Sequence, residues 1–182
     1  MIIWVNGTFG AGKTTTATQL VELSPDLRLF DPEWVGYLLS NNLADHEFTD
    51  FQQLPPWRVL VPPVADEIAR FTGQHLVAVQ TVLVEDYWQE IETGLIGLGH
   101  SVFHVVLDAD QDTLHARIDA DENGIDIRKW RHEHVDPYLA ARPWMLASAD
   151  LVINTSDADA ESAAAEILQY ARQAEKSISK VG

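Results

Sequence analysis

Residues 7–14 read GTFGAGKT, and this segment constrains the fold of the chain more than any other. It matches the pattern G-x-x-x-x-G-K-[ST] at every position, and its glycines let a backbone wrap closely around an anion and aim its N–H groups inward. An apolar run over residues 1–6 precedes the segment, and residues 14–23 carry apolar side chains at helical spacing. Strand, loop and helix in this order predict a phosphate-binding loop rather than a glycine-rich turn without a ligand.

The residue types of this loop have expected roles toward a nucleoside triphosphate. Lys13 reaches the β- and γ-phosphates, and the Thr14 hydroxyl binds the Mg²⁺ that accompanies them. ATP and Mg²⁺ are therefore the predicted ligands. The turn after the last expected strand, residues 155–157, is where an adenine ring rests in such folds. The predicted nucleotide-binding residues are Gly7, Thr8, Phe9, Gly10, Ala11, Gly12, Lys13, Thr14, Thr15, Arg117, Thr155 and Ser156.

The composition excludes several other classes of function. A net charge of −16 over 182 residues repels a phosphate backbone, which argues against nucleic acid as a partner, and it equally opposes a polybasic grip on anionic lipid. The absence of cysteine rules out disulfides and thiolate metal sites. The chain begins with an apolar strand rather than a basic leader, and no apolar run approaches the length of a membrane span. We expect a cytoplasmic protein, and its oligomeric state stays open.

Five strand-then-helix units follow one another along the chain. The expected strands are residues 1–6, 27–30, 75–80, 102–107 and 151–155. This alternation predicts an α/β fold of the P-loop NTPase kind, a three-layer structure with a five-stranded parallel sheet flanked by helices. We expect one domain over residues 1–182, similar to nucleotide kinases, with an acceptor-binding insertion at about 32–73 and a lid at about 122–142.

Two helix boundaries are predicted from local signals. Pro62 and Pro63 should break or restart the helix expected over residues 57–71, because proline removes a backbone donor. The spacing Ser156-x-x-Asp159 is typical of a capping box and should open the last helix at Ser156.

Acceptor-binding candidates gather between the second and third strands. Asp31 ends the second strand, where parallel strands face the ligand crevice; it can hold an acceptor hydroxyl and take its proton, or cap the next helix, and the two roles are compatible. Arg58 can bind an anionic group or pair with a neighbouring carboxylate, and Trp57 can stack on a ring or pack in the core. Gln80 stands where a Walker B strand would supply an aspartate. The predicted acceptor-binding residues are Asp31, Trp34, Trp57, Arg58 and Gln80.

The densest positive cluster of this acidic chain is RKWRH at residues 128–132. In kinases of this shape the equivalent segment is a lid whose arginines close over the transferred phosphate. The alternative is a solvated charged helix neutralised by nearby carboxylates. We favour the lid. His132 and His134 have the spacing of half a metal site, but nothing in the sequence completes it. The predicted catalytic residues are Lys13, Asp31, Arg128 and Arg131.

The chain also resembles a known family, the bacterial tunicamycin-resistance ATP-binding proteins, within the broader group of chloramphenicol phosphotransferase and shikimate kinase. The resemblance rests on residues 3–14 (IWVNGTFGAGKT), 30–36 (FDPEWVG) and 50–58 (DFQQLPPWR), and it extends to QTVLV at 80–84. The family is implied to bind ATP and to protect cells from tunicamycin, a lipid-tailed antibiotic that contains uridine. One type is membrane-associated through an amphipathic C-terminal helix; the tail of this chain is acidic and alanine-rich, so membrane association does not carry over.

We interpret the chain as an ATP-binding, kinase-like protein for a small-molecule acceptor, tunicamycin or a related nucleoside compound. Two hypotheses stay open. In the first the protein is a phosphotransferase, in which Lys13 and the lid arginines stabilise the transferred group and Asp31 activates the acceptor hydroxyl. In the second it is an ATP-dependent binding protein that sequesters the compound without chemistry.

Overall fold

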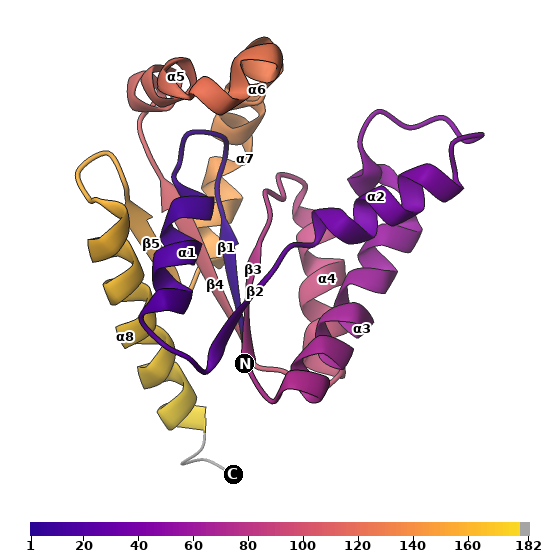
Figure 1. Ribbon diagram of the computed structural model, residues 1–182, viewed down its shortest axis with the longest axis vertical. Helices are drawn as coiled ribbons and strands as arrows, with labels where there is room; N and C mark the ends of the chain where they lie inside the picture. Colours follow the sequence, from indigo (N-terminus) through magenta and orange to yellow (C-terminus); the bar gives the residue numbers. More distant parts are fainter. Residues whose placement is uncertain (179–182) are drawn as a thin grey trace.

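Five parallel strands form the sheet at the centre of the molecule: β1 (Ile2–Asn6), β2 (Leu27–Phe30), β3 (His75–Val79), β4 (Val102–Asp108) and β5 (Leu151–Asn154). The computed structural model describes residues 1–178, apart from the side chains of residues 123, 124 and 178. The strand order is β2-β3-β1-β4-β5 (Figure 1). Because β1 lies between β3 and β4, the loop that follows it opens at the middle of the sheet edge. The predicted α/β fold is confirmed.

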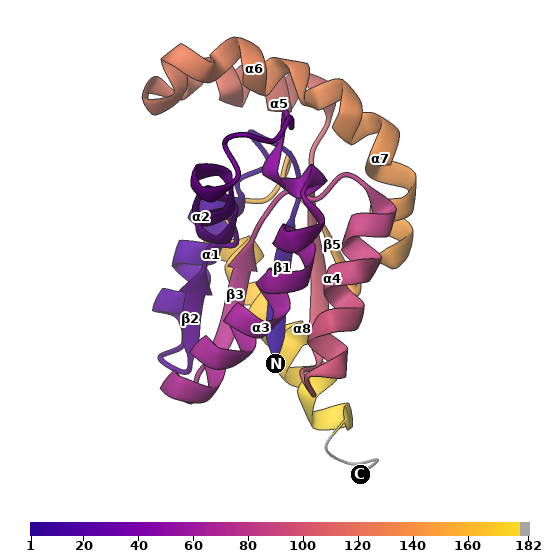
Figure 2. The same ribbon diagram turned by 90° about the vertical axis from the view of Figure 1, so that its right-hand side faces the viewer.

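Helices cover both faces of this sheet (Figures 1 and 2). On one face α1 (Lys13–Glu22) packs against α8 (Ala160–Ile178), and on the other α3 (Pro55–Thr72) packs against α4 (Glu85–Gly97). Next to α3 lie α2 (Glu33–Asn42) and the short helix η1 (Phe51–Gln53). Beyond the carboxyl ends of the central strands lies an arch of helices, α5 (Gln111–Ala120), η2 (Glu122–Ile127), α6 (Arg128–Glu133) and α7 (Val135–Ser148).

The two faces of the sheet bury separate apolar cores. Ile2 and Trp4 of β1 pack with the side chains of α3 and α4, whereas Ile3 and Val5 pack with those of α1 and α8. Successive side chains of a strand point to opposite faces, so a strand covered on both sides needs apolar residues at every position. This two-sided burial explains why the strands read as continuous apolar runs.

The predicted break at Pro62 and Pro63 is wrong, because α3 runs through both prolines as one helix. Pro62 is buried against α4 at Gly94, where an added Cβ atom would lie 2.7 Å from the Pro62 ring. Packing of α3 on α4 therefore offsets the backbone hydrogen bonds that the two prolines cannot make.

The predicted start of the last helix at Ser156 is also wrong. The carboxylate of Asp159 accepts a hydrogen bond from the Ser162 N–H at 2.8 Å, so Asp159 caps α8. The Ser156 hydroxyl instead donates to the Asp110 carboxylate at 2.7 Å. Within residues 1–178, no helix has the length and apolar character that crossing a membrane requires.

Candidate functional site

The P-loop, residues 7–14, leads from β1 into α1 with positive φ angles at its three glycines. A Cβ atom on Gly7 would lie 2.7 Å from the carbonyl oxygen of Leu107, and one on Gly10 would lie 2.8 Å from that of Leu114. Only glycine lets the loop pass this close to β4 and α5. Gly12 precedes α1 and provides no side-chain cap, so the first N–H groups of this helix point to the loop interior, as an anion site requires.

Lys13 lies in the first turn of α1, and its ammonium group donates a hydrogen bond to the Thr8 carbonyl oxygen at 3.0 Å. Burial lowers the pKa of Lys13 from 10.5 to about 8. The Glu33 carboxylate raises this pKa in part, and the Arg131 guanidinium lowers it further. Two cations and one carboxylate therefore share the mouth of the P-loop.

Arg117 and Thr155 brace the outer side of the P-loop. The Arg117 guanidinium donates to the carbonyl oxygens of Gly10, at 3.2 Å, and Thr155, at 2.6 Å. The Thr155 hydroxyl donates to the Ala11 carbonyl oxygen at 3.1 Å. Ser156 follows and lines a cavity of about 420 Å³ beside the ends of β4 and β5. These three predicted nucleotide-binding residues thus lie together next to the loop, and their contact with a nucleotide stays a prediction.

Phe9 of the P-loop packs its ring against the arch of helices. Its ring lies 4.9 Å from that of Trp130 and meets the His134 ring edge-on at 5.6 Å, measured between ring centres. The guanidinium carbon of Arg131 lies 5.7 Å from the same ring, and the Lys13 ammonium group lies 5.5 Å from it. Arg131 also pairs with Asp121. The structure brings Arg131 to the loop, and its action on phosphate stays a prediction.

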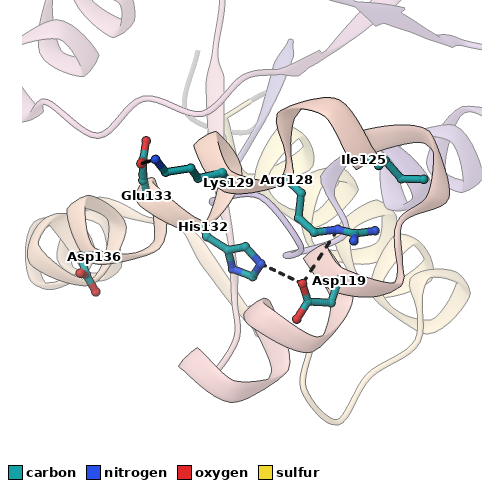
Figure 3. Close-up of a pocket in the computed structure, with 7 residues that line it drawn as sticks. All are labelled: Asp119, Ile125, Arg128, Lys129, His132, Glu133 and Asp136. Carbon is teal, nitrogen blue, oxygen red and sulfur yellow. Dashed lines mark hydrogen bonds and ion pairs between the residues drawn. The ribbon is translucent and has the colours of Figure 1, made fainter.

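Arg128, the other predicted lid arginine, lines a cavity of the arch. This cavity of about 680 Å³ is formed by α5, η2, α6 and α7, and in it the Nε of Arg128 lies 3.9 Å from the Asp119 carboxylate (Figure 3). His132 bonds the same carboxylate at 2.9 Å, and its Nδ1 lies 2.6 Å from that of His115. Among the residues that the structure describes, no three histidine or carboxylate side chains are grouped to hold a metal ion.

Helix α7 is fixed to the sheet. Arg142 donates two hydrogen bonds to the carboxylate of Asp108, at 2.8 and 2.6 Å, and the Tyr138 hydroxyl donates to it at 2.5 Å. Trp144 donates to the Leu83 carbonyl oxygen at 3.1 Å. Sequence reasoning misses Asp108, although its place after a buried strand is a signal of the same kind as that of Asp31.

The end of β2 and the start of α2 supply carboxylates on the other side of the loop. Asp31 accepts a hydrogen bond from the Glu33 N–H at 2.9 Å, which is the capping contact that the sequence predicts. Glu33 is half-buried and accepts a hydrogen bond from the Tyr37 hydroxyl at 3.1 Å. Burial, and then repulsion by Asp31, raises the pKa of Glu33, which Lys13 partly opposes. Sequence reasoning misses Glu33, although it stands two residues after a strand-end aspartate.

Three of the five predicted acceptor-binding residues, Trp34, Trp57 and Arg58, lie in different surroundings. Trp34 is 70% exposed and meets the Tyr37 ring edge-on. Trp57 is fully buried, and its indole N–H donates to the Pro32 carbonyl oxygen at 3.0 Å.

Arg58 is buried as well. Its guanidinium bonds Glu90 at 2.7 Å and the Gln52 carbonyl oxygen at 2.6 Å, and it stacks on the Tyr87 ring at 4.0 Å. Trp34 thus faces solvent, whereas Trp57 and Arg58 join α3 to neighbouring elements; their binding roles remain predictions.

Gln80 is buried and directly follows β3. Its amide group donates to the Thr81 carbonyl oxygen at 3.2 Å, and its own side-chain oxygen has no partner among the described residues. Thr81 donates from its hydroxyl to the Gly7 carbonyl oxygen at 2.7 Å, and Asn6 exchanges hydrogen bonds with the Val82 backbone at 3.1 and 3.0 Å. These contacts fix the P-loop to the end of β3.

Comparison with known proteins gives one family and several related structures. A family model described as "AAA domain" matches residues 2–140. No curated protein matches the chain in sequence. The structure of the tunicamycin resistance protein of Deinococcus radiodurans is 26% identical, with a TM-score of 0.71, over 91% of this chain and 92% of that one.

Two kinase structures are more distant. An unliganded sugar kinase from Janibacter sp. HTCC2649 is 17% identical, with a TM-score of 0.65, over 94% of both chains. Shikimate kinase from Acinetobacter baumannii in complex with shikimate is 18% identical, with a TM-score of 0.59, over 94% of this chain and 93% of that one. At this identity both show the fold alone. Together the comparisons confirm the predicted P-loop kinase fold and the predicted family resemblance, and they indicate a nucleotide-binding, kinase-like function.

Proposed function

The chain belongs to the AAA domain family, and we propose that it transfers the γ-phosphoryl group of ATP to a hydroxyl of a tunicamycin-like nucleoside compound, and so confers resistance to it. The observation that carries the proposal is the meeting of opposite charges at the P-loop mouth. Lys13 and Arg131 lie on the phosphate side, and the carboxylates of Asp31 and Glu33 lie at the start of α2. The name of the Deinococcus protein supports the choice of acceptor.

The residues present fit ATP with Mg²⁺. The loop leaves no room for a Cβ atom at Gly7 or Gly10, and the uncapped start of α1 suits a phosphate. The Thr14 hydroxyl lies in the first turn of α1 and would hold Mg²⁺, which when bound neutralises charge on the phosphates. Arg117, Thr155 and Ser156 would border the nucleoside end of ATP.

In this proposal Lys13 and Arg131 stabilise the charge of the transferred group, and their meeting at the Phe9 ring supports this role. In phosphoryl transfer the protein acts by positioning and by stabilising charge on the transferred group, and arginines in this role accelerate transfer by about 10³–10⁵. Lys13 binds the phosphates in place of the Thr8 carbonyl oxygen. Arg128 is the second lid arginine in this proposal and exchanges Asp119 for phosphate when the arch closes.

The second candidate function is sequestration of the compound without transfer. It is favoured by the aromatic surface beside the carboxylates, where the exposed Trp34 contacts Tyr37 and Tyr37 contacts Phe51. Such a surface suits a planar ring whether or not chemistry follows.

Mass spectrometry of tunicamycin after incubation with the protein, ATP and Mg²⁺ separates these functions. We expect the compound to gain one HPO₃ group with the parent protein and to stay unmodified with Lys13→Met. Unmodified tunicamycin that is nevertheless retained by an ATP-bound parent protein would identify a sequestering protein and overturn the phosphotransferase proposal.

A further inference from the structure

The short helix η1 carries two neighbouring side chains that contact different parts of the molecule. Phe51 belongs to the aromatic surface beside α2: its ring centre lies 6.4 Å from that of Tyr37 and 5.3 Å from that of Trp57. A Cβ atom on Gly36 would lie 2.6 Å from the Phe51 ring, so α2 and η1 are in close contact. A molecule bound on this surface therefore touches η1 directly or through α2.

Gln52, the next residue, connects η1 to the P-loop. Its amide group donates a hydrogen bond to the Thr81 carbonyl oxygen at 2.9 Å, and the Thr81 hydroxyl donates to the Gly7 carbonyl oxygen at 2.7 Å. The Gly7 carbonyl group shares one planar peptide unit with the Thr8 N–H, which points the opposite way. Holding this carbonyl oxygen therefore fixes the direction of an N–H group in the loop, and such directions determine how well a loop binds phosphate.

The backbone of Gln52 is itself held in place. The Asp50 carboxylate accepts the Gln52 N–H at 2.9 Å, and the Arg58 guanidinium donates to the Gln52 carbonyl oxygen at 2.6 Å. Arg58 is buried and pairs with Glu90 of α4 at 2.7 Å. Because these contacts fix the origin of the Gln52 side chain, a shift of η1 reaches Thr81 through the Gln52 amide group.

We propose that Gln52 and Thr81 are positioning residues that couple the acceptor site to the P-loop. An acceptor on the aromatic surface holds η1, and Gln52 and Thr81 in turn hold the Gly7 carbonyl oxygen in the orientation that binds phosphate. Each ligand that orders this link reduces the ordering cost left for the other, so each raises the affinity for the other by the same factor. The inference rests on the proposed function for the identity of the acceptor, and it applies to transfer and to sequestration alike.

Calorimetry with a non-hydrolysable ATP analogue and Mg²⁺, with and without tunicamycin, measures this coupling. We expect tunicamycin to tighten the binding of the analogue to the parent protein by about 5- to 150-fold, the usual range for two coupled sites. Gln52→Met removes the amide donor and keeps the length of the side chain, whereas Thr81→Val removes the hydroxyl and keeps the branched shape. Each variant breaks one of the two hydrogen bonds, and in each the tightening should fall below about twofold.

Two further variants separate this role from a merely structural one. Thr81→Ser keeps the hydroxyl and should restore the coupling. The double variant of Gln52→Met and Thr81→Val should lose no more coupling than either single variant, because two bonds in series connect nothing once one of them is broken.

Gln53→Met is the matched control, because Gln53 lies on the same short helix and its side chain bonds Thr49 at 3.1 and 3.0 Å. It should keep the coupling of the parent protein. Hydrogen exchange gives a second readout that needs no acceptor. The analogue alone should slow the exchange of the amides of residues 51–54 in the parent and in Gln53→Met, but not in Gln52→Met.

Each other outcome has a definite meaning. If tunicamycin binds the parent without changing its affinity for the analogue, or if Gln52→Met keeps the coupling, the link is wrong while the proposed function stands. If tunicamycin does not bind, the proposed function fails and hydrogen exchange decides about the link. Unchanged exchange of residues 51–54 on binding of the analogue then overturns the link, and slowed exchange that Gln52→Met abolishes supports it.

Discussion

Lys13 is held in an unfavourable setting until a ligand arrives. Its ammonium group is partly buried, donates a hydrogen bond to the Thr8 carbonyl oxygen and lies near the Phe9 ring, and the Glu33 carboxylate compensates its charge only in part. Arg131 adds a second positive charge nearby. Such a site favours a polyanion strongly, because the phosphates of ATP compensate both cations at once. Without a nucleotide, we expect the buried charge of Lys13 to lower the free energy of unfolding.

We predict that Lys13→Met stabilises the nucleotide-free protein by about 1–3 kcal/mol and removes most of its affinity for ATP. Because folding lowers the pKa of Lys13 to about 8, the unfolded chain binds more protons between pH 8 and 10.5. The free energy of unfolding of the parent therefore gains a contribution that rises with pH in this range and is absent from the variant. Urea unfolding and calorimetry provide the measurements.

Lys129→Met is the matched control, since Lys129 is exposed on α6 and pairs only loosely with Glu133, at 3.8 Å. It should change neither stability nor ATP affinity appreciably. An ATP affinity of Lys13→Met equal to that of the parent would disprove the assignment of the P-loop.

For single residues, the sequence predicts those roles that follow from a contiguous motif or from a position at the end of a strand. The P-loop residues follow from one contiguous motif, and Asp31 follows from its place at a strand end. Glu33 is not predictable in the same way, because its link to Lys13 arises only when α2 packs near the P-loop. Arg58 is ambiguous in the sequence because its partner Glu90 lies 32 residues away on another helix.

The arch of helices divides into two parts with different attachments. The part before His134 contacts the P-loop through Phe9, whose ring lies beside the Trp130 ring and the Arg131 guanidinium. The part after His134, α7, is fixed to β4 by Asp108. We therefore infer that closure over a nucleotide involves residues 121–134 and not the whole predicted lid up to residue 142.

We predict that Asp108→Asn loosens α7, because the amide cannot accept the two hydrogen bonds of Arg142 and the bond of Tyr138 as a carboxylate does. Loss of these charge-assisted bonds should cost about 1–3 kcal/mol of stability. Hydrogen exchange should report faster opening of residues 135–148. Asp119→Asn, which removes the partner of His132 and Arg128 on the arch, should leave the exchange of α7 unchanged. If α7 exchanges its amide hydrogens at the same rate in Asp108→Asn and in the parent, Asp108 does not fix α7, and the division of the arch at His134 is wrong.

Element boundaries show where sequence patterns stop being sufficient. The strands and most helices follow from apolar spacing, and β2 coincides with the predicted residues 27–30. The continuity of α3 through Pro62 does not follow from apolar spacing. It depends on Gly94 of α4, which has no side chain and so lets the Pro62 ring pack closely. The cap of α8 is Asp159 rather than Ser156 because Ser156 has a competing partner, Asp110.

At the scale of the whole molecule, the core on the α3–α4 side contains a buried polar residue next to its aromatic centre. His104 of β4 is fully buried and stacks on the Trp88 ring at 4.1 Å between ring centres. Its Nε2 lies 3.5 Å from the Asn6 amide nitrogen, and its Nδ1 lies 3.4 Å from the Ser148 carbonyl oxygen. These contacts fit a neutral ring with the proton on Nδ1, so His104 joins the strand that carries the P-loop to α7 without bringing a charge into the core.

We predict that His104 makes the whole fold sensitive to acid. Burial lowers its pKa from 6.5 to about 4, so between these values the unfolded chain binds a proton that the folded chain does not. The free energy of unfolding should therefore fall as the pH drops from 6.5 toward 4, and His104 should account for up to about 3 kcal/mol of that fall. His104→Gln removes the titrating group and keeps a donor for Ser148, so urea unfolding should show a smaller fall over this pH range, whatever its stability at pH 6.5. His46→Gln, at an exposed histidine beside Asp45, should retain the parental fall. If His104→Gln retains it as well, the acid sensitivity comes from the carboxylates of the surface and not from the core.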